Sequence, residues 1–153
     1  MIPAFDTATG NLPPGLHRAS WAEIRDRFGY TDHRRKLLVG LYRVLHALKS
    51  VGCRRAYIDG SFITSKQHPG DFDGCWDVEH VDVDELERQA PALLEFANRR
   101  KAQKTAYGGE MFPARGRAEP SGTVFVEFFQ RDRNTGDPKG IVVIDLKDSN
   151  DYE

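Results

Sequence analysis

A segment near the middle of the chain combines a glycine-serine pair with two closely spaced carboxylates. Gly60 and Ser61 are followed, after a spacer of nine residues, by Asp71 and Asp73. Glycine lets the backbone turn sharply and approach a ligand, and the serine hydroxyl with the following amides at a helix start can bind phosphate oxygens. Alternate residues of an extended segment project to the same side, so both carboxylates can converge on hard cations such as Mg²⁺ or Mn²⁺. The pattern therefore predicts a site for a nucleotide and its metal ions.

Each half of this pattern also has an ordinary structural interpretation. A glycine-serine pair can be a simple turn, and an Asp-x-Asp sequence often solvates a loop. Lys66 lies in the spacer and could neutralise nucleotide phosphates, although an exposed lysine beside Gln67 and His68 would look identical. The phosphate-and-metal interpretation is favoured because both halves fall at the ends of expected strands.

Helices are expected on both sides of the motif. Ser20 and Glu23 have the spacing of a capping box, which predicts a short helix to about Phe28. From Thr31, leucine and valine recur at helical spacing until Gly52 supplies a stop. Helical spacing returns with a further set of apolar residues, in which Pro91 either kinks one helix or opens a second: Leu86, Ala90, Leu93, Leu94 and Ala97.

Four short runs rich in aromatic and β-branched side chains are typical of strands. They span 54–59, 71–78, 123–129 and 140–146. The glycines and prolines between 108 and 122 predict an irregular stretch instead. Together these elements predict an α/β (α+β) fold, in which helices pack on a small mixed β-sheet.

The length of 153 residues fits a single domain over 1–153, and the prolines and glycines of residues 1–19 predict an extended N-terminal arm. A content of 39% hydrophobic and 29% charged residues excludes a disordered or collagen-like chain. No apolar run is long enough to cross a membrane, and the first residues lack the pattern of a signal peptide. We therefore expect a cytoplasmic protein with no membrane contact.

Charge is unevenly distributed along the chain, although the formal net charge is only −1. Residues 71–87 contain eight acids and no lysine or arginine, whereas 99–117 contain six basic residues and only Glu110 as an acid. Charged helix faces are usually just solvated, but a basic segment of this kind could also contact RNA or nucleotide phosphates.

The glycine-serine pair, the spacer and the carboxylate pair resemble the signature of the nucleotidyltransferase superfamily, which includes DNA polymerase β and the minimal nucleotidyltransferases. The resemblance covers mainly residues 57–77 and extends to uncharacterised bacterial and phage-borne proteins of that superfamily. It implies a nucleotidyltransferase-like fold, in which Gly60 and Ser61 form the phosphate-binding turn. It also implies that Asp71 and Asp73 are ligands of Mg²⁺ or Mn²⁺.

Members of that superfamily usually carry a third carboxylate on a later strand between apolar neighbours. Glu127 matches this description and is preferred here, while Asp145 matches the same local pattern on another expected strand. The long separation between Asp73 and Glu127 and the unusual residues that follow Asp73 are departures from the family. They leave a diverged or inactive member as an alternative.

The resemblance implies a metal-dependent enzyme that moves an NMP group from an NTP to a hydroxyl and releases pyrophosphate. Asp71, Asp73 and Glu127 would hold the metal, and Glu127 would also help to deprotonate the acceptor. Implied acceptors are a tRNA end, a protein side chain such as tyrosine, or an antibiotic hydroxyl, in a toxin–antitoxin or phage-defence setting. The alternatives are an inactive antitoxin or regulatory module of the same fold that binds a partner protein, and metal-dependent phosphate-ester hydrolysis.

Overall fold

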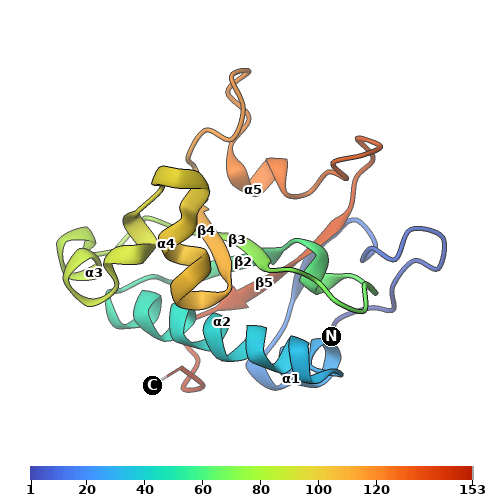
Figure 1. The fold of residues 1–153 in the computed structure, drawn as a ribbon, viewed down its shortest axis with the longest axis horizontal. Helices are drawn as coiled ribbons and strands as arrows, with labels where there is room; N and C mark the ends of the chain where they lie inside the picture. Colours follow the sequence, from blue (N-terminus) through green and yellow to red (C-terminus); the bar gives the residue numbers. More distant parts are fainter. Residues whose placement is uncertain (153) are drawn as a thin grey trace.

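Five strands form one mixed sheet that carries the glycine-serine and carboxylate motifs (Figure 1). The computed structural model describes residues 1–152. In spatial order the strands are β1 (Gly15–Arg18), β5 (Gly140–Asp145), β2 (Arg55–Asp59), β3 (Phe72–Trp76) and β4 (Gly109–Pro113). β1 is parallel to β5 and β3 is parallel to β4, whereas β2 is antiparallel to both of its neighbours. The predicted mixed sheet with packed helices is confirmed.

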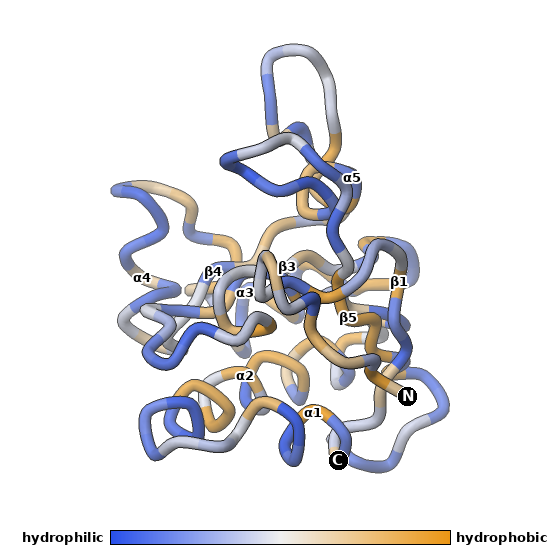
Figure 2. Tube along the Cα trace, turned by 90° about the vertical axis from the view of Figure 1, so that its right-hand side faces the viewer, coloured by the Kyte–Doolittle hydropathy of each residue, from blue (hydrophilic) through white to orange (hydrophobic). Residues whose placement is uncertain are grey.

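Two helices cover one face of this sheet (Figure 1). In α1 (Trp21–Phe28) and α2 (Asp32–Ser50), the caps Ser20 and Thr31 accept hydrogen bonds from early backbone amides, as capping residues do. The apolar residues of α2 recur every three or four positions and are buried against the sheet, and hydrophobic segments gather there in Figure 2. No helix within residues 1–152, the 19-residue α2 included, has the apolar length to cross a bilayer.

Helical segments flank the β4 edge of the sheet. They are α3 (Val83–Gln89), the 3₁₀ turn η2 (Pro91–Leu94) and α4 (Ala97–Tyr107). Pro91 opens η2 as its first residue and does not kink a longer helix. At the start of α4, Asn98, Arg99 and Arg100 have left-handed backbone angles, with φ of 52°, 57° and 59°. Three such residues in succession are costly for L-amino acids, so the contacts made by this turn must hold it in place.

The prediction of a strand over 123–129 is wrong. This segment contains the short helix α5 (Phe125–Phe128), which stands on the sheet face opposite to α2 (Figure 1). The ring of Phe125 stacks on Phe112 of β4 at 4.1 Å between centroids, and Phe129, one turn later, also contacts Phe112. Strand propensity reflects side-chain packing on a sheet, and here the aromatic rings obtain better packing from one helical turn.

The irregular stretch predicted between 108 and 122 contains the edge strand β4. Gly109 is needed at the start of β4 because the backbone there lies very close to β3. A Cβ atom at Gly109 would lie 2.5 Å from both the ring and the carbonyl oxygen of Phe72. Pro113 is tolerated at the end of β4 because that strand pairs on one side only. The residues that signal a turn in the sequence therefore permit a close strand pair.

Substitution of Gly40 tests the close packing of α2 against the end of α4. A Cβ at this position would lie 1.7 Å from the carbonyl oxygen of Tyr107. Gly40→Ala should therefore lower the free energy of unfolding by about 2–4 kcal/mol, although alanine is the better helix former by about 1 kcal/mol. Urea denaturation measures this loss. The neighbouring Val39 is 64% exposed, so Val39→Ala should change stability by less than about 1 kcal/mol. Equal stabilities of the two variants would contradict the close approach.

Candidate metal centre

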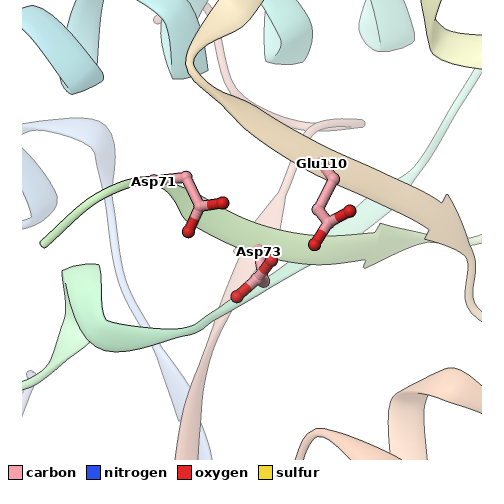
Figure 3. A group of neighbouring side chains, drawn as sticks. All are labelled: Asp71, Asp73 and Glu110. Atoms are coloured by element: carbon pink, nitrogen blue, oxygen red, sulfur yellow. The ribbon is translucent and has the colours of Figure 1, made fainter. Parts of the chain in front are cut away.

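Three carboxylates from β3 and β4 point toward one another (Figure 3). The strand register pairs Asp73 with Glu110, and Asp71 lies two residues earlier on the same side of the chain. One carboxylate oxygen from each of Asp71, Asp73 and Glu110 lies within 4.8 Å of the other two. Oxygen atoms of several carboxylates in such a small volume are the ligands that Mg²⁺ and Mn²⁺ prefer.

The electrostatics of this cluster favour a cation. Burial, and then the neighbouring charges of Asp71 and Glu110, raise the pKa of Asp73 to about 8. Burial and Glu110 also raise the pKa of Asp71, while Lys104, Arg133 and other cations partly oppose the rise. Like charges held together out of water destabilise one another, and a divalent cation removes that repulsion. The residues present therefore fit a metal ion of this class.

Gly60 brings the glycine-serine turn directly against the cluster. Its φ of +87° lies in the region that favours glycine, and a Cβ there would lie 2.6 Å from Oδ2 of Asp73. Ser61 opens the 3₁₀ turn η1 (Ser61–Ile63), and its carbonyl oxygen accepts a hydrogen bond of 2.7 Å from the Thr64 hydroxyl. The turn predicted to bind phosphate thus contacts a predicted metal ligand.

Arg34 of α2 fixes the spacer between the two halves of the motif. Its side chain is fully buried, and its guanidinium donates to the carbonyl oxygens of Phe62 at 2.5 Å, Thr64 at 2.8 Å and Lys66 at 2.6 Å. It also donates to the carbonyl oxygen of Phe28 at 3.2 Å. A buried cation is costly unless its donors are satisfied. Here backbone carbonyl oxygens, in place of a carboxylate, accept from both terminal nitrogens of Arg34, while its buried Nε has no hydrogen-bond partner within residues 1–152. Arg34 therefore holds the backbone that presents Lys66.

A cavity of about 720 Å³ opens beside the carboxylates and the glycine-serine turn. It is lined by residues of the motif, Asp59, Gly60, Ser61, Thr64, Lys66, Asp71 and Asp73, and by Lys139, Asn11 and residues between 119 and 136. Much of its outer wall comes from the largely hydrophilic loops on either side of α5 (Figure 2). The volume lies within the range of small-molecule sites. It brings together all five predicted residues of the central motif.

Basic side chains line the same cavity. Lys66, Arg131, Arg133 and Lys139 lie on its wall together with the carboxylates. Lys139 forms an ion pair of 2.7 Å with Asp59, and both side chains are largely buried. Burial raises the pKa of Asp59, and the ammonium of Lys139 opposes that rise. A cavity with cations facing a carboxylate cluster suits a ligand that carries both phosphates and a metal ion.

The N-terminal arm ties together the two loops that line the cavity. The carbonyl oxygen of Gly10 accepts a hydrogen bond from the amide of Ser65, at 3.0 Å. The Asn11 side chain donates to Asp132 at 2.9 Å. The carbonyl oxygen of Leu12 accepts from the amide that begins β5. The spacer loop and the loop after α5 are therefore linked through the first residues of the chain.

The third carboxylate is Glu110, and neither Glu127 nor Asp145 joins the cluster. Glu127 lies on α5, where it is exposed, because the predicted strand is a helical turn. Asp145 lies at the far end of the sheet, opposite the first residue of β2 and 3.8 Å from Arg18. The one sequence signal for Glu110 is the pair of apolar residues that follows it, Met111 and Phe112, and the flanking glycines and proline obscure the strand.

Comparisons with known proteins assign the chain to a family but do not indicate an activity. A family model described as "Family of unknown function (DUF6932)" matches residues 3–145. No curated protein and no solved structure matches the chain significantly.

Proposed function

We propose that this chain is a metal-dependent nucleotidyltransferase. It belongs to the DUF6932 family, whose function is unknown. It would move an NMP group from an NTP to a hydroxyl, in the cytoplasm, where nucleoside triphosphates are available. The observation that carries the proposal is the convergence of Asp71, Asp73 and Glu110, because Asp71 and Asp73 also line one cavity together with the Gly60-Ser61 turn. The resemblance of this motif to the nucleotidyltransferase superfamily supports the same activity.

Asp71, Asp73 and Glu110 would hold Mg²⁺ or Mn²⁺ through their facing oxygens. Bound there, the cation supplies positive charge that stabilises the transferring phosphoryl group and the leaving pyrophosphate. The cluster lies on adjacent strands, which makes its geometry rigid before any ligand binds. Rigid placement of this kind is what phosphoryl transfer requires from a protein, because positioning and charge stabilisation supply most of its catalysis.

The cavity wall would hold the triphosphate. Gly60 allows close approach of the backbone to the ligand, and the Ser61 hydroxyl lines the cavity beside it. Lys66, Arg131 and Arg133 line the same space and would neutralise phosphate oxygens that do not contact the carboxylates. Their distribution over two loops allows them to enclose the phosphates from different sides.

In the reaction, the acceptor hydroxyl oxygen forms a bond to the α-phosphorus of the NTP. The bond from this phosphorus to the oxygen that bridges it to the β-phosphorus breaks, and pyrophosphate leaves with the electron pair. The hydroxyl proton passes to a carboxylate of the cluster and from there to water. The acceptor must therefore place its hydroxyl beside Asp73 and Glu110.

A matched pair of variants tests this assignment. Each labelled NTP is incubated with cell extract and Mg²⁺ or Mn²⁺, and transfer of label to RNA, protein or small molecules is measured. Glu110→Gln keeps the shape of the side chain but removes its charge, so transfer should fall by about 100-fold or more, which corresponds to about 3 kcal/mol. Glu127→Gln changes an exposed residue outside the cluster, and its transfer rate should stay close to that of the wild type.

Two other outcomes would contradict the proposal. Release of NMP without a labelled acceptor, with the same dependence on Glu110, would indicate metal-dependent hydrolysis with water as the nucleophile. If no NTP gives a carboxylate-dependent reaction, the enzyme hypothesis is excluded. A protein-binding module of the same fold, such as an antitoxin, would then be favoured.

A further inference from the structure

The exposed side of α4 carries two lysines, Lys101 and Lys104. Lys101 and Lys104 are one helical turn apart and therefore lie on the same side of α4. Lys101 lines a shallow groove of about 390 Å³ whose other lining residues are mostly small: Glu95, Ala97, Asn98, Ala102, Thr105 and Ala106. Arg100 of the same helix pairs with Glu110 of the cluster at 2.6 Å. The helix that carries the two lysines therefore lies beside the carboxylates.

The positive charge on this side of the molecule is not neutralised locally. Glu110, the one acid between residues 99 and 117, is paired with Arg100 at 2.6 Å. Within residues 1–152, no carboxylate forms an ion pair with Lys101 or Lys104. Glu95, at the edge of the groove, is the single acid that lines it. Unpaired lysines in a row are suited to a partner with regularly spaced negative charges.

Aromatic rings continue this surface toward the cavity. Phe96 is 39% exposed and stacks on Phe112 with 14° between ring planes, and Phe112 stacks on Phe125 with 7° between ring planes. Phe129 contacts both Phe125 and Phe128, and Phe128 lines the cavity. The exposed ring of Phe96 therefore ends a series of rings that begins at the cavity wall. Exposed rings of this kind provide stacking surfaces for bases.

The ring series and the carboxylates share one face of the sheet. Glu110 and Phe112 are alternate residues of β4, so their side chains project to the same side. The guanidinium of Arg100 lies over the ring of Phe112 at 5.5 Å while it pairs with Glu110. The left-handed turn at the start of α4 is what directs Arg100 to both residues. A ligand that lies across Phe96 and α4 thus has a short path to the metal ligands.

We propose that the surface formed by Phe96, Lys101 and Lys104 binds single-stranded nucleic acid. This surface would guide a terminal hydroxyl to the carboxylates as the acceptor, a role that rests on the proposed nucleotidyl transfer. The lysines contact the phosphates and the Phe96 ring stacks with a base. Duplexes keep their bases stacked internally, so they bind this surface less tightly than single strands.

Direct binding, without NTP and with EDTA present, tests the surface independently of catalysis. Fluorescence anisotropy follows labelled single-stranded RNA and DNA of about 16 nucleotides at about 50 mM salt. Lys101→Glu and Lys104→Glu should each weaken binding by about 10-fold or more, because each reverses a charge at a phosphate contact. Lys147→Glu, which reverses an exposed lysine after β5, should change the dissociation constant by less than about 2-fold.

Phe96 is tested with two variants because its ring also packs on Phe112. Phe96→Leu keeps an apolar side chain in place and Phe96→Ala removes most of it, and both should weaken binding by about 5-fold or more through loss of stacking. Equal loss with RNA and DNA supports contacts to phosphates and bases alone. Loss confined to RNA supports the same surface with added recognition of the 2′-hydroxyl.

The proposed binding surface and the proposed enzymatic activity can be contradicted independently of each other. No binding of either single strand at low salt, or lysine variants that bind as tightly as the wild type, would overturn the surface. Nucleotidyl transfer to protein or a small molecule with no such binding would also overturn it, while supporting the enzyme. Lysine-dependent binding without any transfer would support the surface and contradict only its role as an acceptor site.

Discussion

Asp73→Asn should abolish nucleotidyl transfer and, in EDTA at neutral to alkaline pH, make the protein more stable than the wild type. The loss of transfer should reach about 10³-fold, which corresponds to about 4 kcal/mol of transition-state stabilisation. Asp73 lies between Asp71 and Glu110, so its replacement removes the central charge of the proposed metal site. The same charge destabilises the folded protein when no cation is bound.

The gain in stability should depend on pH in a defined direction. In the unfolded chain, an aspartate loses its proton near pH 4, whereas in the folded protein the pKa of Asp73 is about 8. The unfolded state therefore loses this proton first as pH rises, and the wild type becomes less stable between about pH 4 and pH 8. Asparagine has no such proton. The variant's advantage should be absent near pH 4 and reach several kcal/mol above about pH 8, because each unit of pKa difference between the two states corresponds to about 1.4 kcal/mol.

Thermal unfolding across this pH range, in EDTA and then with excess Mg²⁺ or Mn²⁺, measures the effect. The cation should stabilise the wild type and leave Asp73→Asn almost unchanged. Asp84→Asn, on the exposed side of α3, provides the control and should follow the wild type at every pH and with the cation. A wild type whose stability responds neither to pH nor to the cation would contradict a crowded carboxylate site.

Arg34→Met should lower the free energy of unfolding by about 3–5 kcal/mol. Methionine fills much of the same space but leaves the carbonyl oxygens of Phe28, Phe62, Thr64 and Lys66 without their buried donor. Arg34→Lys keeps the charge, but one ammonium lacks the planar fork that reaches several carbonyl oxygens at once. It should therefore lose stability as well, though less than the methionine variant.

The adjacent arginine supplies a matched control for this experiment. Arg35 is largely exposed, and its guanidinium donates hydrogen bonds to Gly29 and Asp32 at the surface, so Arg35→Met should cost less than about 1 kcal/mol in urea denaturation. Arg34→Lys should also raise the KM for NTP more than it lowers kcat, because it loosens the loop that presents Lys66. Equal midpoints for Arg34→Met and Arg35→Met would contradict the role of Arg34.

Much of this site could be predicted because its first half is local in sequence. Gly60 and Ser61 directly follow β2, and Asp71 and Asp73 lie at the start of β3. One short segment therefore contains the turn and two of the three carboxylates. The helices that support them follow from the spacing of their leucines and valines. Local pattern and tertiary structure agree in this part of the chain.

The third carboxylate of the cluster could not be identified from the sequence, because its position depends on strand order. Glu110 reaches Asp73 only because β4 pairs with β3 in parallel, and the glycines that allow this pairing look like turn residues. For residues 125–129 the error is the reverse. Their aromatic and β-branched side chains predict a strand, but ring stacking on Phe112 favours a helical turn. Lys139 and Asp59 are likewise joined only by the folded sheet.

The hydrogen bonds of the N-terminal arm also affect the order in which the protein folds. β1 precedes its sheet partner β5 by more than a hundred positions in the chain. Contacts of such long range form slowly, because a long loop must close before they can. β2, β3 and β4 lie closer together in the chain and can bring the three carboxylates together earlier, whereas Asn11 can join Asp132 only after more than a hundred further residues have been added. A growing chain would thus bring the three carboxylates together before the cavity beside them is complete.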